Sequence, residues 1–258
     1  MGAVTVPVPP PEGADFLRAF LFAAVMLAAS AGSAFAQSRP ELSIDLMTDE
    51  RRRGISWSDG GPAAAASLYW APAGPFWTEV AAVTLRGSAR HGGADAVVDW
   101  SGGLQHDIGP WRLGARGGVH IFPGRSGLAY GELGGSAGFT LGPALVEALA
   151  LYAPPQDGIG GDNLYLRGGI SVGIPATPVT LSAGIGRSSG SVDDPVKAAR
   201  LRPAGSYTDY QLGIEYRQAR WSAGLTFTDT DERETRPSPY ADPGNAGSRL
   251  TGRVRFSF

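Results

Sequence analysis

The sequence contains no cysteine among its 258 residues. A disulfide-stapled fold and a thiolate metal site are therefore excluded. Histidine is also scarce, with three residues, and 22 lysines and arginines nearly balance 24 aspartates and glutamates without forming a basic block. Because nucleic acid binding depends on clustered positive charge, we expect no nucleic acid partner.

Long apolar runs are nearly absent as well. The run AFLFAAVMLAA at residues 19–29 is shorter than the roughly 17 to 25 residues that a membrane helix needs. It is followed by Ala34-Phe35-Ala36, which has the small-residue pattern of a signal peptidase site. We therefore predict a signal peptide over residues 1–36 and a mature domain over 37–258. Since no second apolar run approaches about 18 residues, any membrane span must be β.

What the chain does have is alternation of apolar and polar residues between glycine-rich breaks. Glycine accounts for 38 residues. About twelve alternating segments have the length of a tilted strand that crosses a bilayer. They cover residues 41–48, 63–70, 76–86, 94–106, 111–122, 128–141, 144–152, 163–174, 179–188, 206–217, 221–230 and 249–258.

The links between these segments alternate in length. Every second link is brief: 71–75, 107–110, 142–143, 175–178 and 218–220. The remaining links are mostly longer and polar, as at 50–62, 153–162, 189–205 and 231–248. Short turns at one rim and long loops at the other are typical of an outer-membrane barrel with both termini in the periplasm.

The faces of the segments support this interpretation. In 206–217, Tyr210, Leu212 and Ile214 share one face, and Asp209, Gln211 and Glu215 share the other. A soluble β-sandwich would also alternate, but charges recur in the middle of strands, which a wet barrel interior tolerates. Aromatic residues beside the short turns also predict a membrane girdle, namely Trp70, Trp77, Trp111, Trp221 and Tyr216. The predicted fold class is therefore all-β, a transmembrane antiparallel β-barrel of about 12 strands.

The stretch ERRRGISWSDGGPAAAA at residues 50–66 resembles the early signature of the TorF-like porin family of proteobacteria. The matching positions are Arg53, Gly54, Ile55, Ser56, Ser58, Asp59, Pro62 and Ala63. The DAVVDWSGG stretch at 95–103 and the C-terminal phenylalanine also fit that family. The resemblance implies an outer-membrane barrel and does not name a transported solute.

The last strand, RLTGRVRFSF, resembles the signal that outer-membrane proteins present to the barrel-insertion machinery. Val254, Phe256 and Phe258 would face lipid, and this strand must close against the first. We therefore expect outer-membrane lipid, lipopolysaccharide and the insertion machinery as partners, and the oligomeric state is left open.

The other face of the strands would line a lumen. A barrel of about twelve strands has a backbone diameter of roughly 24 Å, which leaves an opening near 10 Å unless a loop folds inside. The signs of the lining charges balance, which predicts weak ion selectivity. If a loop does fold inside, the candidates are 189–205 and 231–248. The predicted pore-lining residues are Asp45, Asp99, Arg112, Arg116, His120, Glu132, Glu147, Arg167, Asp209, Glu215, Arg217, Arg253 and Arg255.

Some of these charges should pair. A hairpin with Phe122 opposite Leu128 would let Glu132 reach Arg116 or His120 diagonally. Closure of the barrel would set Asp45 beside Arg253 or Arg255. These groups would form structural ion pairs or, alternatively, a ladder that binds solute.

The sequence offers little support for catalysis or for cofactor binding. Acyl transfer needs a serine or aspartate beside a histidine, and His120 has no inward serine within a few rungs. We expect no enzyme activity, no catalytic residue, no metal site and no cofactor. The acidic links DGIGGD (157–162) and SVDDP (191–195) lack calcium-loop spacing and are interpreted as solvated loops.

The sequence therefore predicts a porin-like channel of the bacterial outer membrane for passive, weakly selective diffusion of ions and small polar solutes. The alternative is a non-conducting barrel that acts through its long extracellular loops.

Overall fold

The computed structural model describes residues 39–72, 74–232, 238–240 and 243–258. The predicted signal peptide, residues 1–36, lies outside the described residues. Within the described ranges, no helix combines the length and the hydrophobicity that crossing a bilayer requires.

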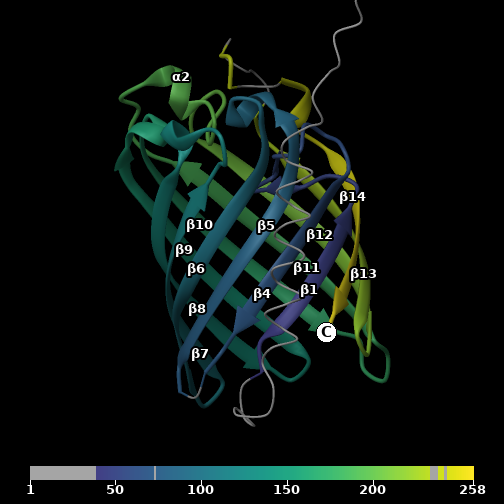
Figure 1. The fold of residues 1–258 in the computed structure, drawn as a ribbon. Coiled ribbons are helices and arrows are strands. Elements are labelled where there is room, and N and C mark those ends of the chain that lie inside the picture. Colours follow the sequence, from purple (N-terminus) through teal and green to yellow (C-terminus); the bar gives the residue numbers. More distant parts are fainter. Residues whose placement is uncertain (1–38, 73, 233–237, 241–242) are drawn as a thin grey trace, which may run out of the picture.

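Twelve antiparallel strands of the described residues close into a barrel, as predicted (Figure 1). The barrel strands are β1 (Glu41–Met47), β4 (Ala63–Trp70), β5 (Phe76–Ser88), β6 (Ala94–Ile108), β7 (Trp111–Ile121), β8 (Tyr130–Leu141), β9 (Ala144–Gln156), β10 (Gly161–Gly173), β11 (Val179–Ser189), β12 (Tyr207–Gln218), β13 (Trp221–Thr230) and β14 (Arg249–Ser257). A separate small sheet consists of β2 (Arg51–Arg52) and β3 (Ile55–Ser56). The short helices are η1 (Ala89–His91), η2 (Ser126–Leu128), η3 (Asp157–Ile159), α2 (Pro195–Ala198) and η4 (Pro243–Asn245).

Each strand pairs with its neighbour in sequence, and β1 closes the barrel against β14. The short turns and the C-terminus share one end of the barrel, and α2 and the longer loops share the other (Figure 1). The turn between β8 and β9 is two residues long and places Gly142 at φ 58°, a conformation that favours glycine. By the habit of bacterial barrels, the end with short turns is periplasmic and the other extracellular.

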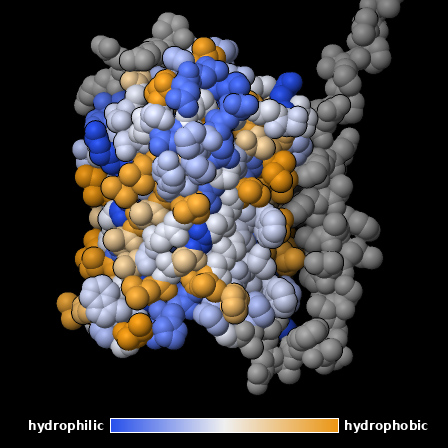
Figure 2. Space-filling view, turned by 90° about the vertical axis from the view of Figure 1, so that its left-hand side faces the viewer, coloured by the Kyte–Doolittle hydropathy of each residue, from blue (hydrophilic) through white to orange (hydrophobic). Residues whose placement is uncertain are grey.

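The outer wall is a belt of exposed apolar side chains. Figure 2 shows hydrophobic residues spread over the wall and hydrophilic ones gathered toward the upper end. Apolar side chains exposed around a closed barrel are stable in lipid and costly in water. The barrel therefore lies in the bacterial outer membrane, as predicted. Large exposed members of the belt include Leu104, Ile108, Leu113, Leu133, Val146, Ile170, Leu212 and Leu225.

The predicted girdle residues divide between the two faces of the wall. Trp70, Trp111, Tyr216 and Trp221 are exposed near the short turns. The exception is Trp77, which lines a cavity of the lumen. It lies one position from the exposed Phe76, and both faces of the segment 76–86 mix apolar and polar residues, so the alternation does not reveal which side faces inward.

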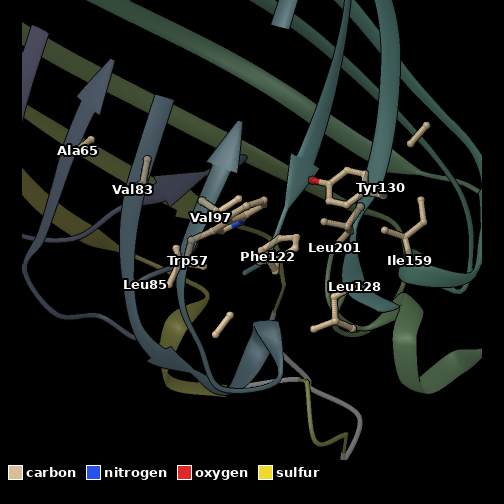
Figure 3. Packing of buried hydrophobic residues seen from close by; sticks show 12 residues of the cluster. Trp57, Ala65, Val83, Leu85, Val97, Phe122, Leu128, Tyr130, Ile159 and Leu201 are labelled. Atoms are coloured by element: carbon tan, nitrogen blue, oxygen red, sulfur yellow. The ribbon is translucent and has the colours of Figure 1, made fainter. Parts of the chain in front are cut away.

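The extracellular half of the lumen contains a compact apolar cluster, which we call the loop core (Figure 3). In Figure 3, Trp57 lies beside Val97 and Phe122, and Leu201 lies between Tyr130 and Ile159. Inward-facing strand residues therefore pack against side chains that loops send into the barrel. The loop core comprises Trp57, Ala65, Val83, Leu85, Ala94, Val97, Phe122, Leu128, Tyr130, Ala153, Ile159 and Leu201.

Candidate functional site: the lumen and the segment folded into it

Residues 48–62, here called the lumen hairpin, leave β1 and turn into the barrel. Within them β2 and β3 pair through Arg51 opposite Ser56, and the chain reverses at Arg53 (φ 53°) and Gly54 (φ 74°). Gly54 is required for a second reason, because a Cβ there would lie 2.6 Å from Thr230 Cγ2 and 2.8 Å from Asp209 Cβ. The tip of the hairpin thus touches the wall formed by β12 and β13.

The base of the lumen hairpin is organised by the buried side chain of Asp49. The Ser56 and Ser58 hydroxyls donate to its Oδ1, and Arg51 Nη1 donates to its Oδ2 over 3.2 Å. The Glu50 N–H donates to Ser58 Oγ over 2.9 Å. The Ser-x-Ser spacing therefore closes the hairpin on a single carboxylate.

Two arginines of the hairpin form ion pairs with the opposite wall of the barrel. Arg52 Nη2 lies 2.7 Å from Asp99 Oδ2 on β6, and Arg53 pairs with Glu132 on β8. His120 of β7 lies between the two carboxylates, with Nδ1 2.7 Å from Asp99 Oδ1 and Nε2 3.6 Å from Glu132 Oε1. The hairpin therefore spans the lumen, from β12 and β13 at its tip to β6 and β8.

The pKa of Arg52 reflects this setting. Burial lowers the pKa, whereas the charges of Asp99 and Glu50 raise it, and the net shift is upward from the ordinary value for an arginine. Arg52 therefore stays protonated and keeps its positive charge for the ion pair with Asp99 on the wall.

Trp57 anchors the hairpin in the loop core. Its ring lies 4.3 Å from the ring of His91 and 6.1 Å from that of Phe122, and the Arg52 guanidinium sits 4.1 Å above it. Burial, and then the charges of Arg200 and Arg90, lower the pKa of His91 well below 6.5. His91 is therefore neutral where it packs.

Part of the loop that follows β11 also enters the core. Arg200 is fully buried and donates to the carbonyl oxygens of Leu128 (2.8 Å) and Gly158. Burial lowers its pKa to about 10. Arg90 Nη1 donates to the Arg200 carbonyl over 2.8 Å, and Arg90 Nε donates to that of Ser56 over 3.2 Å. These buried cations tie the hairpin and the loops together through backbone carbonyls.

The identity of the inserted segment differs from the prediction. The sequence pointed to 189–205 and 231–248, whereas the main insertion is the lumen hairpin, residues 48–62. The first candidate contributes Arg200 and Leu201 to the core. The second lies against the hairpin, where Arg51 Nη2 donates to the Gly247 carbonyl over 3.0 Å. The sequence does contain a signal for this insertion. Arg51, Arg52 and Arg53 are three adjacent cations, and cations that are buried need carboxylates nearby.

Beneath the lumen hairpin the lumen is hollow and polar. A cavity of about 520 Å³ lies against the hairpin, and a second of about 330 Å³ is lined by residues nearer the short turns. Arg116 and Arg167 line both cavities. Glu79 lines the larger, while Glu147 and Trp77 line the smaller.

The predicted pore-lining residues fall into three groups, and their role in transport stays a prediction. Asp45 binds Arg253 (2.6 Å) and Arg255 (2.8 Å) across the closure of β1 on β14. Arg112 pairs with Asp107 (2.8 Å) and Arg217 with Glu215 (3.1 Å), both exposed near the short turns. The residues that line one or both cavities are Asp99, Arg116, His120, Glu132, Glu147, Arg167, Asp209 and Arg253.

The predicted hairpin register is confirmed, since His120 is opposite Tyr130 and Gly118 is opposite Glu132. Glu132 reaches His120, one of its two predicted partners. It does not pair with the other, Arg116, whose guanidinium lies 5.7 Å from the Trp77 ring. In the part of the chain that the structure describes, no group of three His, Asp or Glu side chains is arranged to hold a metal ion.

A closed antiparallel barrel with an apolar outer belt and a charged lumen is the architecture of an outer-membrane porin. The chain belongs to the Gcw_chp family, described as bacterial proteins of unknown function, which it matches over residues 28–248. The resemblance to the TorF-like porins stays a prediction. No curated protein matches the sequence.

Solved porins share the fold at low sequence identity. The KdgM porin is similar with a TM-score of 0.57 and 7% identity, over 84% of this chain and 99% of that chain. The NanC porin is similar with a TM-score of 0.57 and 11% identity, over 84% of this chain and 98% of that chain. A further structure of the KdgM porin, in complex with disordered oligogalacturonate, has a TM-score of 0.54 and 8% identity, over 86% of this chain and 99% of that chain. At these identities the likeness shows the fold.

Proposed function

We propose that this protein is a porin-like channel of the outer membrane that passes small polar solutes through a lumen narrowed by residues 48–62. The observation that carries the proposal is the hollow, charge-lined lumen beneath the hairpin. A barrel that served only as a scaffold would gain stability by filling this space with packed side chains.

Charges of both signs support weak selectivity between potassium and chloride. The larger cavity is lined by Arg116, Arg167 and Arg253 as well as by Glu79, Asp99 and Asp209. Opposite charges on facing walls favour passage of hydrated ions and polar solutes of either sign. We do not expect an enzyme. Ser101 and His120 line the same cavity, but the two ring nitrogens of His120 face the carboxylates of Asp99 and Glu132, and neither is directed at a nucleophile.

A second candidate function is a non-conducting barrel whose loops act outside the cell. The lumen hairpin favours this candidate, because it crosses the lumen and is held on several walls by Gly54, Arg52 and Arg53.

The test is single-channel recording from refolded protein in a planar lipid bilayer. Steady ohmic steps, smaller than those expected for an open twelve-stranded lumen, support the narrowed channel. Absence of current from protein that is folded in the same preparation overturns it in favour of the non-conducting barrel.

A further inference from the structure

Most lumen arginines near the hairpin are held by carboxylates, but two are held by neutral groups. Arg167 Nη2 donates to the amide oxygen of Gln211 over 2.7 Å. The Arg116 guanidinium lies 5.7 Å from the centre of the Trp77 ring. Among the described residues, neither guanidinium forms an ion pair within 4.0 Å, whereas Arg52, Arg53 and Arg253 do.

An amide oxygen and an aromatic ring position a guanidinium without cancelling its charge. Arg116 and Arg167 are therefore oriented without an ion pair within 4.0 Å among the described residues, and the carboxylate of Asp209 offsets the charge of Arg167 only from a longer distance. On the wall, Arg116 is opposite Gly103 and Gly134, and Arg167 is opposite Gly186 on one side and Leu149 on the other. The wall thus leaves space around the Arg116 guanidinium and on one side of Arg167.

Arg116 and Arg167 also occupy the place where the two cavities adjoin, because both line each of them. A solute that moves from one cavity to the other therefore passes within reach of two cations that no ion pair within 4.0 Å holds among the described residues. The cavity volumes of about 520 and 330 Å³ accommodate a molecule of monosaccharide size.

The other residues that line the two cavities restrict the chemical class of the solute that could bind there. Glu147, Ser171 and Ser182 line the smaller cavity, and Glu79 lines the larger. Carboxylates repel a simple inorganic anion, but they accept hydrogen bonds from hydroxyl groups. A planar carboxylate matches the guanidinium fork, and hydroxyl groups match the acidic and serine oxygens. The Trp77 ring adds an apolar surface beside Arg116.

We propose that Arg116 and Arg167 form a binding site for a hydroxylated carboxylate, such as a sugar acid, where the two lumen cavities adjoin. The inference rests on the proposed channel, and it specifies which solutes that channel retains on the way through.

The test compares glucuronate with glucose, which has the same ring and lacks the carboxylate. Binding is measured by isothermal titration calorimetry on refolded protein in detergent, and channel block is measured with the same two probes in planar bilayers. Glucuronate should bind and interrupt the current, and glucose should do neither. In Arg116→Gln with Arg167→Gln, glucuronate affinity should fall by about tenfold or more.

The matched control is Arg187→Gln, which removes an arginine from the outward-facing side of β11 and should leave glucuronate binding unchanged. Equal binding of glucose and glucuronate, or unchanged affinity in the double variant, overturns the site. Calorimetric binding without current would overturn the channel and leave the site standing. Current without selective binding of glucuronate would overturn the site and leave the channel standing.

Discussion

At the scale of the residue, His91 lies in a buried site that opposes a positive charge on its ring. Its ring stacks on Phe122 at 4.7 Å and lies 4.3 Å from Trp57. The charged and titratable groups that act on it are Arg200, Arg90, Arg52 and His120, each of which opposes a second positive charge. The loop core therefore accepts the neutral ring and opposes its protonation.

His91 should make the loop core sensitive to pH. Its pKa is lowered in the packed state from an ordinary value of 6.5, so the opened state binds the proton first. Stability of the loop core should consequently be full above pH 6.5 and decline as the pH falls below it. Limited proteolysis of the extracellular loops, at neutral pH and at about pH 5, measures the change.

The control for this effect is His91→Phe, which keeps a ring between Trp57 and Phe122 and cannot be protonated. Its proteolysis should depend much less on pH. The same pH dependence in His91→Phe and in the natural sequence would mean that His91 is not the group responsible.

At the scale of the element, the lumen hairpin determines how much of the barrel is open. It is a segment without regular pairing to the barrel, held by Asp49 at its base, by Arg52 and Arg53 on the far wall, and by Trp57 in the loop core. Because these anchors lie on different walls, the hairpin is a fixed obstruction and not a loose loop.

Replacing Arg51–Ser56 with an equally long glycine-serine segment should widen the channel. Its side chains and its ion pairs with Asp99 and Glu132 would be lost, so single-channel conductance should rise by about twofold or more. Planar bilayer recording measures this change. As a control, Val192→Ser with Val196→Ser alters an exposed extracellular loop and should leave conductance unchanged. Equal conductance of the hairpin variant and the natural sequence would show that residues 51–56 do not limit the current.

At the scale of the whole molecule, closure of β1 on β14 decides whether the sheet is a barrel. Their register places Asp45 opposite Arg255 and Leu46 opposite Val254. Asp45 is only 3% exposed and accepts hydrogen bonds from both Arg253 and Arg255. Because two cations share one carboxylate, its removal leaves them repelling each other.

Asp45→Ala should therefore weaken the closed barrel by ~2 kcal/mol or more. Asp107→Ala, in an ion pair whose side chains are 53% and 57% exposed, should cost much less, because solvent screens an exposed ion pair. Folded barrels and boiled samples migrate differently in detergent gels, and the temperature at which the folded band disappears measures stability. Equal transition temperatures for the two variants would mean that the Asp45 pairs do not stabilise closure, and a single band that never shifts would contradict the barrel itself.

The barrel could be predicted from the sequence, because strand period, turn length and aromatic position are local properties of the chain. All twelve strands fall on the predicted segments, and the closing partners of Asp45 were predicted from register alone. In β5 both faces carry apolar residues, so the local pattern does not indicate which face is inward. Trp77 was therefore predicted to face the membrane, whereas it lines the lumen.

What fills the lumen could not be predicted in this way, because it depends on contacts between segments that are distant along the chain. The insertion of residues 48–62 depends on Asp99 and Glu132, which lie 47 and 79 positions from their arginine partners, and on Thr230, whose side chain meets the tip at Gly54. The tertiary structure also decided that Arg116 meets Trp77 and Arg167 meets Gln211. Such partners come together only when the barrel closes, because contacts across a lumen join segments that no local pattern connects.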